Sequence, residues 1–146
     1  MKRKLSLAAL CFVAIVATGW YCVEPWALTF IDDGPYFAQD FAGPVEALPV
    51  YSQVELRRFG RAIFSLEARL VSEGQESVLV LRDTDGSVRW AQTPVKPFGE
   101  LGPIQLRRAN LTWYGGWRIA ISPKNQEGGY LYLDTFGGYR FLNHSW

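Results

Sequence analysis

An uninterrupted apolar run near the amino terminus constrains this chain more than any other feature. The run covers 19 residues, 5–23, and follows Lys2, Arg3 and Lys4 without a charged side chain before Glu24. As a helix with a rise of about 1.5 Å per residue it would extend about 28 Å, close to the hydrocarbon thickness of a bilayer. Residues 1–23 are therefore predicted to insert into a membrane, with the basic end in the cytoplasm and the body on the other side.

Two interpretations of this segment remain open, and both export the body. As a retained signal-anchor, it would place Trp20, Tyr21 and Trp26 at the outer interface, and Pro25 would end the helix. As a signal peptide, it would be cleaved near Gly19, where small residues precede the cut. We favour the anchor, which predicts a single-pass bacterial inner-membrane protein with a periplasmic or otherwise extracytoplasmic body. Cleavage would instead give a secreted or periplasmic protein.

The cysteine content and the net charge of the body argue against two classes of protein, disulfide-bonded secreted modules and nucleic-acid-binding proteins. Residues 24–146 contain no cysteine, so the body must be stable without disulfides, which favours a bacterial protein over a small eukaryotic secreted module. The same residues carry 12 Lys and Arg against 14 Asp and Glu, a net charge of −2. Affinity for nucleic acid comes mainly from basic side chains that displace counterions. Nucleic acid is therefore not an expected partner.

The body is predicted to be mainly β, a small antiparallel β-barrel or β-sandwich that follows the transmembrane helix. Residues 24–53 mix proline, glycine and aromatic residues, and we expect an irregular segment packed on the domain. Residues 54–146 read as sequential hairpins of short strands. The stretch 54–63 fits either a helix or a strand, and the spacing of its apolar residues favours one short helix before a strand over 64–70.

Two hairpins can be given an expected register. A loop at 83–86 would pair Leu81 with Val88 and place Val88 and Trp90 in the core. A tight turn at residues 115–116 would set Trp113 directly across from Arg118, on the face away from the core.

Aromatic side chains concentrated in the last hairpins are the candidate binding residues. Flat exposed rings can stack on sugars or pack against a partner protein, and a neighbouring guanidinium strengthens such a platform. The four residues proposed for ligand or partner binding are Trp113, Arg118, Tyr130 and Tyr132.

Catalytic chemistry finds little support in the sequence. His144 is the single histidine and the body has no thiol, so no catalytic residue, cofactor or metal site is predicted. Carboxylates at Asp32 and Asp33, or at Asp83 and Asp85, could serve a metal-assisted hydrolase, but such Asp and Gly patterns are typical of turns.

The sequence therefore favours a non-catalytic interaction or assembly module held in the membrane by residues 5–23, with another cell-envelope protein as its partner. The alternative is an exported module that binds cell-wall polysaccharide, with Trp113 and the Tyr130/Tyr132 face as its glycan surface. A metal-assisted hydrolase is the third hypothesis.

Overall fold

The computed structural model describes residues 2–29, 37–71, 76–95, 102–124 and 128–144, in two compact units, 1–32 and 33–146. The first unit contains one helix, α1 (Lys2–Thr29), which continues past Val23 and through Pro25. The expected helix end at Glu24-Pro25 is thus wrong, since a proline removes one N–H from the helical ladder and the bonds on either side of it can continue. Among the described residues, no helix is long and apolar enough to cross a membrane.

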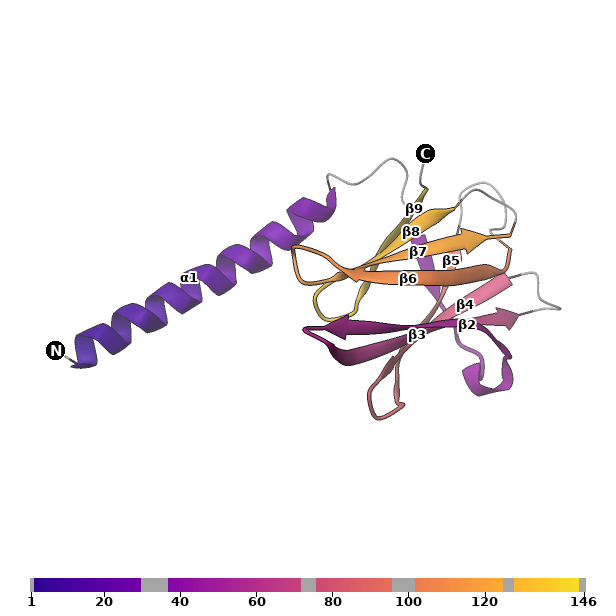
Figure 1. Cartoon of the computed structure of the whole chain (residues 1–146), viewed down its shortest axis with the longest axis horizontal. Coiled ribbons are helices and arrows are strands. Elements are labelled where there is room, and N and C mark those ends of the chain that lie inside the picture. Colours follow the sequence, from indigo (N-terminus) through magenta and orange to yellow (C-terminus); the bar gives the residue numbers. More distant parts are fainter. Residues whose placement is uncertain (1, 30–36, 72–75, 96–101, 125–127, 145–146) are drawn as a thin grey trace. The chain divides into compact units, whose positions relative to one another are not determined.

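The second unit consists of two antiparallel sheets, which confirms a mainly β body (Figure 1). The five-stranded sheet has the order β1-β5-β4-β3-β2 and the four-stranded sheet the order β6-β7-β8-β9. The strands are β1 (Phe37–Asp40), β2 (Val50–Arg58), β3 (Arg61–Val71), β4 (Glu76–Asp83), β5 (Val88–Val95), β6 (Ile104–Leu111), β7 (Trp117–Pro123), β8 (Gly129–Leu133) and β9 (Tyr139–His144). A short 3₁₀ helix, η1 (Val45–Ala47), lies between β1 and β2.

The core lies between the two sheets and follows from the alternation of apolar and polar residues along the strands. On β3, Leu66 and Ala68 point inward, and on β7 Trp117 and Ile119 do so from the opposite sheet. The ring of Phe64 meets the ring of Trp117 edge to face, with 5.5 Å between their centroids. One apolar cluster thus joins the inner faces of both sheets.

Serine hydroxyls satisfy the backbone where β2 and β6 approach each other. Ser52 Oγ donates to the carbonyl of Ile104 at 3.2 Å and accepts from the amide of Leu106 at 2.8 Å. The amide of Ile104 donates to Ser77 Oγ at 2.8 Å. Buried backbone groups are costly to leave unpaired. The Ser52 bonds therefore connect two sheet edges, β2 and β6, that share no ladder, and the Ser77 bond connects β6 to the central strand β4.

The expected helix over 54–63 is wrong, because this stretch forms most of β2 and the turn into β3. Leu56 pairs with Phe64 and is fully buried, whereas Phe59, at the same helical spacing, sits in the turn and is 92% exposed. Packing of Leu56 between the sheets decides in favour of the strand over a weak helical periodicity.

Three hairpins use one turn design, and this shifts both expected registers. In the turns at 83–87, 112–116 and 134–138 the first amide donates to the last carbonyl at 2.9 Å, and the fourth residue is a glycine with φ between 80° and 90°. Such a loop places a glycine in the left-handed region that other residues avoid. The turn at 83–87 brings Val88 opposite Arg82, and a bulge next to it then brings Trp90, not Val88, opposite Leu81. Val88 is 42% exposed and outside the core. Trp90 does pack against the core, as expected.

We expect Leu79→Ala to lower the free energy of unfolding of the full-length protein by about 2–5 kcal/mol, because a buried leucine is lost and a cavity remains. Val88→Ala is the matched control, and we expect a loss of under about 0.5 kcal/mol at this exposed position. Urea unfolding followed by tryptophan fluorescence measures both. Equal losses would contradict the observed register.

Candidate functional site

Three of the four predicted binding residues come together on the outer face of the four-stranded sheet. Arg118 on β7 pairs with Tyr132 on β8, and its guanidinium carbon lies 4.7 Å from the centroid of the Tyr130 ring. The Tyr130 and Tyr132 rings are 6.5 Å apart and tilted by 56°. Arg118 is exposed, Tyr130 is half-buried and Tyr132 is buried, so the cation lies over a partly covered aromatic pair.

This outer face is also the most one-sided in charge. The four strands of the sheet contain four arginines and no aspartate or glutamate over their described lengths. Arg107 reaches across to β7, where its Nε donates to Ser122 Oγ at 2.7 Å, and Arg108 is exposed opposite Ala120. We call the set Arg107, Arg108, Arg118, Tyr130 and Tyr132 the basic face.

The environment of Tyr132 keeps its hydroxyl neutral. Burial raises the pKa of Tyr132 above its ordinary value of 10.0, and the neighbouring Arg118 partly opposes this effect through its charge and a hydrogen bond. The basic face therefore presents arginine side chains beside the neutral phenol of Tyr132. Such a surface suits an anionic partner and has no evident nucleophile.

Trp113, the fourth predicted residue, lies elsewhere. It was expected across from Arg118, but Arg118 pairs with Asn110 on β6, and Trp113 belongs to the turn at 112–116. The reason is that the turn spans five residues in place of two glycines. Trp113 is 64% exposed and packs edge-on against Tyr114, with 5.9 Å between the ring centroids.

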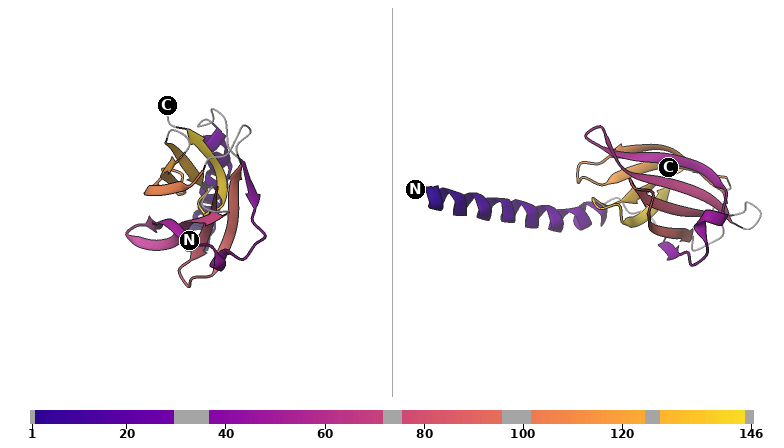
Figure 2. Two further views of the ribbon diagram at one scale, coloured as in Figure 1. Left: turned by 90° about the vertical axis from the view of Figure 1, so that its right-hand side faces the viewer. Right: turned by 90° about the horizontal axis from the view of Figure 1, so that it is seen from below.

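Trp113 instead belongs to one end of the domain, where three turns meet. We call the turns at 58–61, 112–116 and 134–138 the hairpin end; the β2–β3 and β6–β7 turns lie on the same side in both Figure 1 and Figure 2. Each turn carries one large exposed apolar side chain. These are Phe59, Trp113 and Phe136, with exposed fractions of 92%, 64% and 67%.

Arg58 ties the three turns together. Its Nη2 atom donates to the carbonyls of Gly115 at 2.6 Å and Thr135 at 2.7 Å, and its guanidinium lies 4.6 Å from the centre of the Trp117 ring. The Trp117 indole N–H donates to the carbonyl of Arg57 at 3.0 Å. This bond holds the Trp117 ring in place under the Arg58 guanidinium. Charge-assisted bonds of this kind are stronger than neutral ones.

Two further bonds secure the turn at 134–138. Thr135 Oγ1 donates to the carbonyl of Tyr114 at 3.0 Å, and the indole of Trp90 donates to the carbonyl of Gly137 at 2.8 Å. Sequence reasoning missed Phe59 and Phe136 as surface residues. For Phe59 the sequence did contain a signal. A two-residue hairpin turn at Phe59 and Gly60 would leave the Phe59 side chain exposed.

Two of the carboxylates considered for a metal-assisted hydrolase, Asp83 and Asp85, serve as an ion-pair partner and a turn cap. Asp85 Oδ1 accepts from the amide and hydroxyl of Ser87, which lowers the pKa of Asp85 below its ordinary value. Asp83 Oδ1 accepts from Arg89 Nε at 3.0 Å. Within the described ranges no three His, Cys, Asp or Glu residues gather in a metal-like cluster. Asp32 and Asp33 lie outside the described residues.

A buried charge network lies on the outer face of the five-stranded sheet. Glu67 on β3 accepts from Arg69 Nε at 2.7 Å through one carboxylate oxygen and from Arg82 Nε at 3.2 Å through the other. The side chains of Glu67 and Arg69 are each only 9% exposed, beside the fully buried Val78 and Val80. Buried charges of this kind persist only when paired and hydrogen-bonded.

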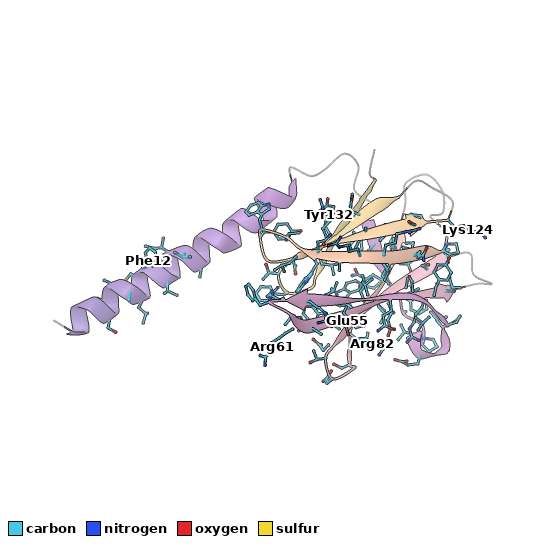
Figure 3. The ribbon with its side chains drawn as sticks, viewed as in Figure 1. Phe12, Glu55, Arg61, Arg82, Lys124 and Tyr132 are labelled. Carbon is cyan, nitrogen blue, oxygen red and sulfur yellow. The ribbon has the colours of Figure 1, made fainter. Side chains whose placement is uncertain are left out.

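The network holds η1 against the sheet. Arg69 Nη1 donates to the carbonyls of Val45 at 2.9 Å and Leu48 at 3.0 Å, and Arg82 Nη2 donates to Glu46 at 2.6 Å. That bond from Arg82 lowers the pKa of Glu46 below its ordinary value. Figure 3 shows Arg82 projecting from the five-stranded sheet, on the opposite side of the domain from Tyr132. These charges therefore have a structural task.

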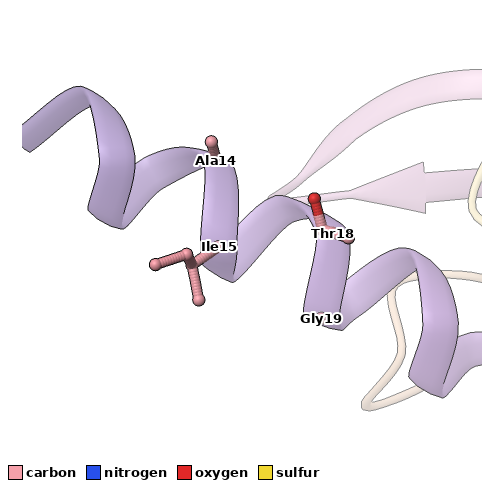
Figure 4. A pocket seen from close by; sticks show the side chains of 4 residues that line it. All are labelled: Ala14, Ile15, Thr18 and Gly19. Atoms are coloured by element: carbon pink, nitrogen blue, oxygen red, sulfur yellow. The ribbon is translucent and has the colours of Figure 1, made fainter.

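The helix contributes one shallow hollow of its own. It is lined by Ala14, Ile15, Thr18 and Gly19, all neighbours on α1 (Figure 4). Small residues at such spacing let a second helix approach closely, but the stripe by itself identifies no ligand.

No protein family model, no curated protein and no solved structure matches this chain. The assignment of function therefore rests on the geometry.

We expect Glu67→Gln to lower the free energy of unfolding by about 3 kcal/mol or more, because two guanidinium groups lose their buried counter-charge. Glu55→Gln is the matched control. Its ion pair with Arg57 is just as short, 2.6 Å, but both side chains are more than half exposed, so we expect a loss of about 0–1 kcal/mol. Urea unfolding compares the two variants, and similar losses would show that the network has no special role.

Proposed function

We propose that this protein is a non-catalytic interaction module, anchored in a bacterial inner membrane, whose basic face binds an acidic surface on a second protein of the cell envelope. The observation that carries this proposal is the convergence of Arg118, Tyr130 and Tyr132 on a sheet face whose strands contain no acidic side chain.

The anchor is supported by the sequence of residues 5–23 and by the three basic residues before it. The proposal of a retained segment with its amino end in the cytoplasm rests on this sequence pattern alone. A tethered domain meets a membrane-bound partner at high effective concentration, so a contact of modest area suffices.

The residues of the basic face are of the kinds that dominate protein interfaces. Arginine and tyrosine are enriched among the residues whose truncation costs most binding energy. The opposing pairs along β6, β7 and β8 hold Arg118 and Tyr132 on a rigid sheet, which limits the entropy lost on binding. A clustered positive charge also speeds encounter with an acidic partner.

A polysaccharide ligand remains the alternative, and the geometry favours it less. Sugar stacking needs an open ring face, whereas the guanidinium of Arg118 already lies over Tyr130 at 4.7 Å. Trp113, the exposed ring that was expected to extend this surface, belongs to the hairpin end. A protein with carboxylates that reach the arginines from outside suits the face better.

The experiment is photo-crosslinking in intact bacterial cells, with benzoylphenylalanine at Asn110, next to Arg118, in the full-length protein. We expect an uncleaved chain in the membrane fraction and a covalent adduct with a second protein. Arg118→Glu should abolish this adduct, because it reverses the charge at the centre of the face, and Tyr130→Ala should weaken it.

Lys124→Glu is the matched control, since it makes the same charge reversal at an exposed site outside the basic face, and the adduct should persist. Absence of any adduct, or an adduct that Arg118→Glu leaves unchanged, would refute the proposed partner surface. Glycan binding that Tyr130→Ala abolishes would favour the alternative. A soluble chain that begins near Trp20 would refute the anchor.

A further inference from the structure

Phe59 lies in an exposed turn and has a backbone conformation that phenylalanine rarely adopts. It is 92% exposed, and its φ of 50° lies in the left-handed region that bulky residues avoid. Gly60 follows with φ 77°, so the pair forms a tight hairpin turn in which asparagine or aspartate would fit the first position without strain. Strain that the fold does not require often marks a functional position.

The other two turns of the hairpin end present matching side chains. Trp113 and Phe136 are each about two-thirds exposed. Neither ring belongs to the apolar core between the two sheets. The bonds from Arg58 to the carbonyls of Gly115 and Thr135 join the three turns, so the rings stand on a fixed base. They are therefore presented outward as a group.

The charges around Phe59 are basic. The turn and its flanks read Arg57-Arg58-Phe59-Gly60-Arg61, and Arg61 is exposed, as Figure 3 shows at this end of the domain. Arg57 is 60% exposed, although it also pairs with Glu55. The three turns themselves contain two arginines, Arg58 and Arg61, and one carboxylate, Asp134, whose Oδ1 accepts from the amides of Phe136 and Gly138. With the charge of Arg57 balanced by Glu55, the turns keep a small positive excess.

We propose that the hairpin end docks on a bilayer that contains anionic phospholipid, with Phe59, Trp113 and Phe136 at the boundary between headgroups and acyl chains. Aromatic rings prefer this boundary, and arginines next to them reach the phosphates of anionic lipids. The proposed anchor would keep the domain close to such a surface, and to that extent the inference rests on the proposed function. The three rings protrude from separate turns. Mobile lipids can pack around each ring separately, so this arrangement suits a bilayer surface.

The test uses the full-length protein in phosphatidylcholine nanodiscs, mixed with sucrose-loaded vesicles that are sedimented. Vesicles are either phosphatidylcholine alone or a 7:3 mixture with phosphatidylglycerol, roughly the anionic content that draws basic segments to membranes. We expect stronger co-sedimentation with the anionic vesicles, and less of it at high salt. Phe59→Asn should weaken binding about tenfold because one buried ring is lost. Arg61→Glu should weaken it by about tenfold or more, since it replaces a favourable charge with a repelled one.

Two controls keep the result interpretable. Asparagine tolerates a positive φ, so Phe59→Asn should unfold at the same temperature as the wild type or higher, and Phe59→Trp should retain binding. Lys124→Glu repeats the charge change at the opposite end of the domain and should bind as the wild type does. Equal sedimentation with both vesicle types, wild-type binding by Phe59→Asn, or an equal loss in Lys124→Glu would overturn the proposal. None of these outcomes involves Asn110 or Arg118, so failure here and failure of the protein-partner proposal are separate results.

Discussion

The stacking of Arg58 on Trp117 is the contact on which the hairpin end of this domain depends. Trp117 is fully buried at the start of β7, and its indole N–H binds the backbone of Arg57 on the opposite sheet. Arg58 covers the ring from the same strand and reaches the carbonyls of two turns. One arginine therefore connects the core, both sheets and three hairpin turns. A lysine could supply the charge but not the flat surface and the fork of donors.

The two outer faces of the domain differ in how their charged side chains are paired. On the five-stranded sheet Glu67 is buried between Arg69 and Arg82, and the cluster fastens η1. The strands of the four-stranded sheet contain no aspartate or glutamate over their described lengths, and Arg118 lies over the ring of Tyr130. The first arrangement uses its charges internally. The second leaves them available, which is why the proposed partner surface is placed there.

Local sequence patterns predicted the class of the fold and the inward direction of several strands. Trp117, Ile119 and Ile121 occupy every second position along β7, and they do point into the core. The predicted registers were wrong for two reasons. The length of each hairpin loop depends on which glycine takes the left-handed conformation, and Gly115 with Gly116 allows more than one choice. Between β4 and β5 a bulge next to Arg82 shifts the pairing further. At 54–63 the helical spacing of Leu56, Phe59 and Ile63 was a coincidence that packing between the sheets overrode.

The candidate site was predictable in part for the same reason. Arg118, Tyr130 and Tyr132 lie on adjacent strands of sequential hairpins, so local pairing was enough to group them. Arg58 could not be found in this way, because its acceptors lie 57 and 77 residues away along the chain. Only the assembled sheets bring these turns together.

The most direct test of this account is amide hydrogen exchange by NMR in an Arg58→Met variant of the full-length protein. The account predicts that the turn amides of Gly115 and Gly137 exchange about tenfold faster or more, since charge-assisted bonds worth about 1.5–3 kcal/mol are lost. Relative to them, the core amide of Leu131 should keep most of its protection. Unchanged exchange at both turns would show that the hairpin end holds its shape without Arg58, and would contradict the central claim.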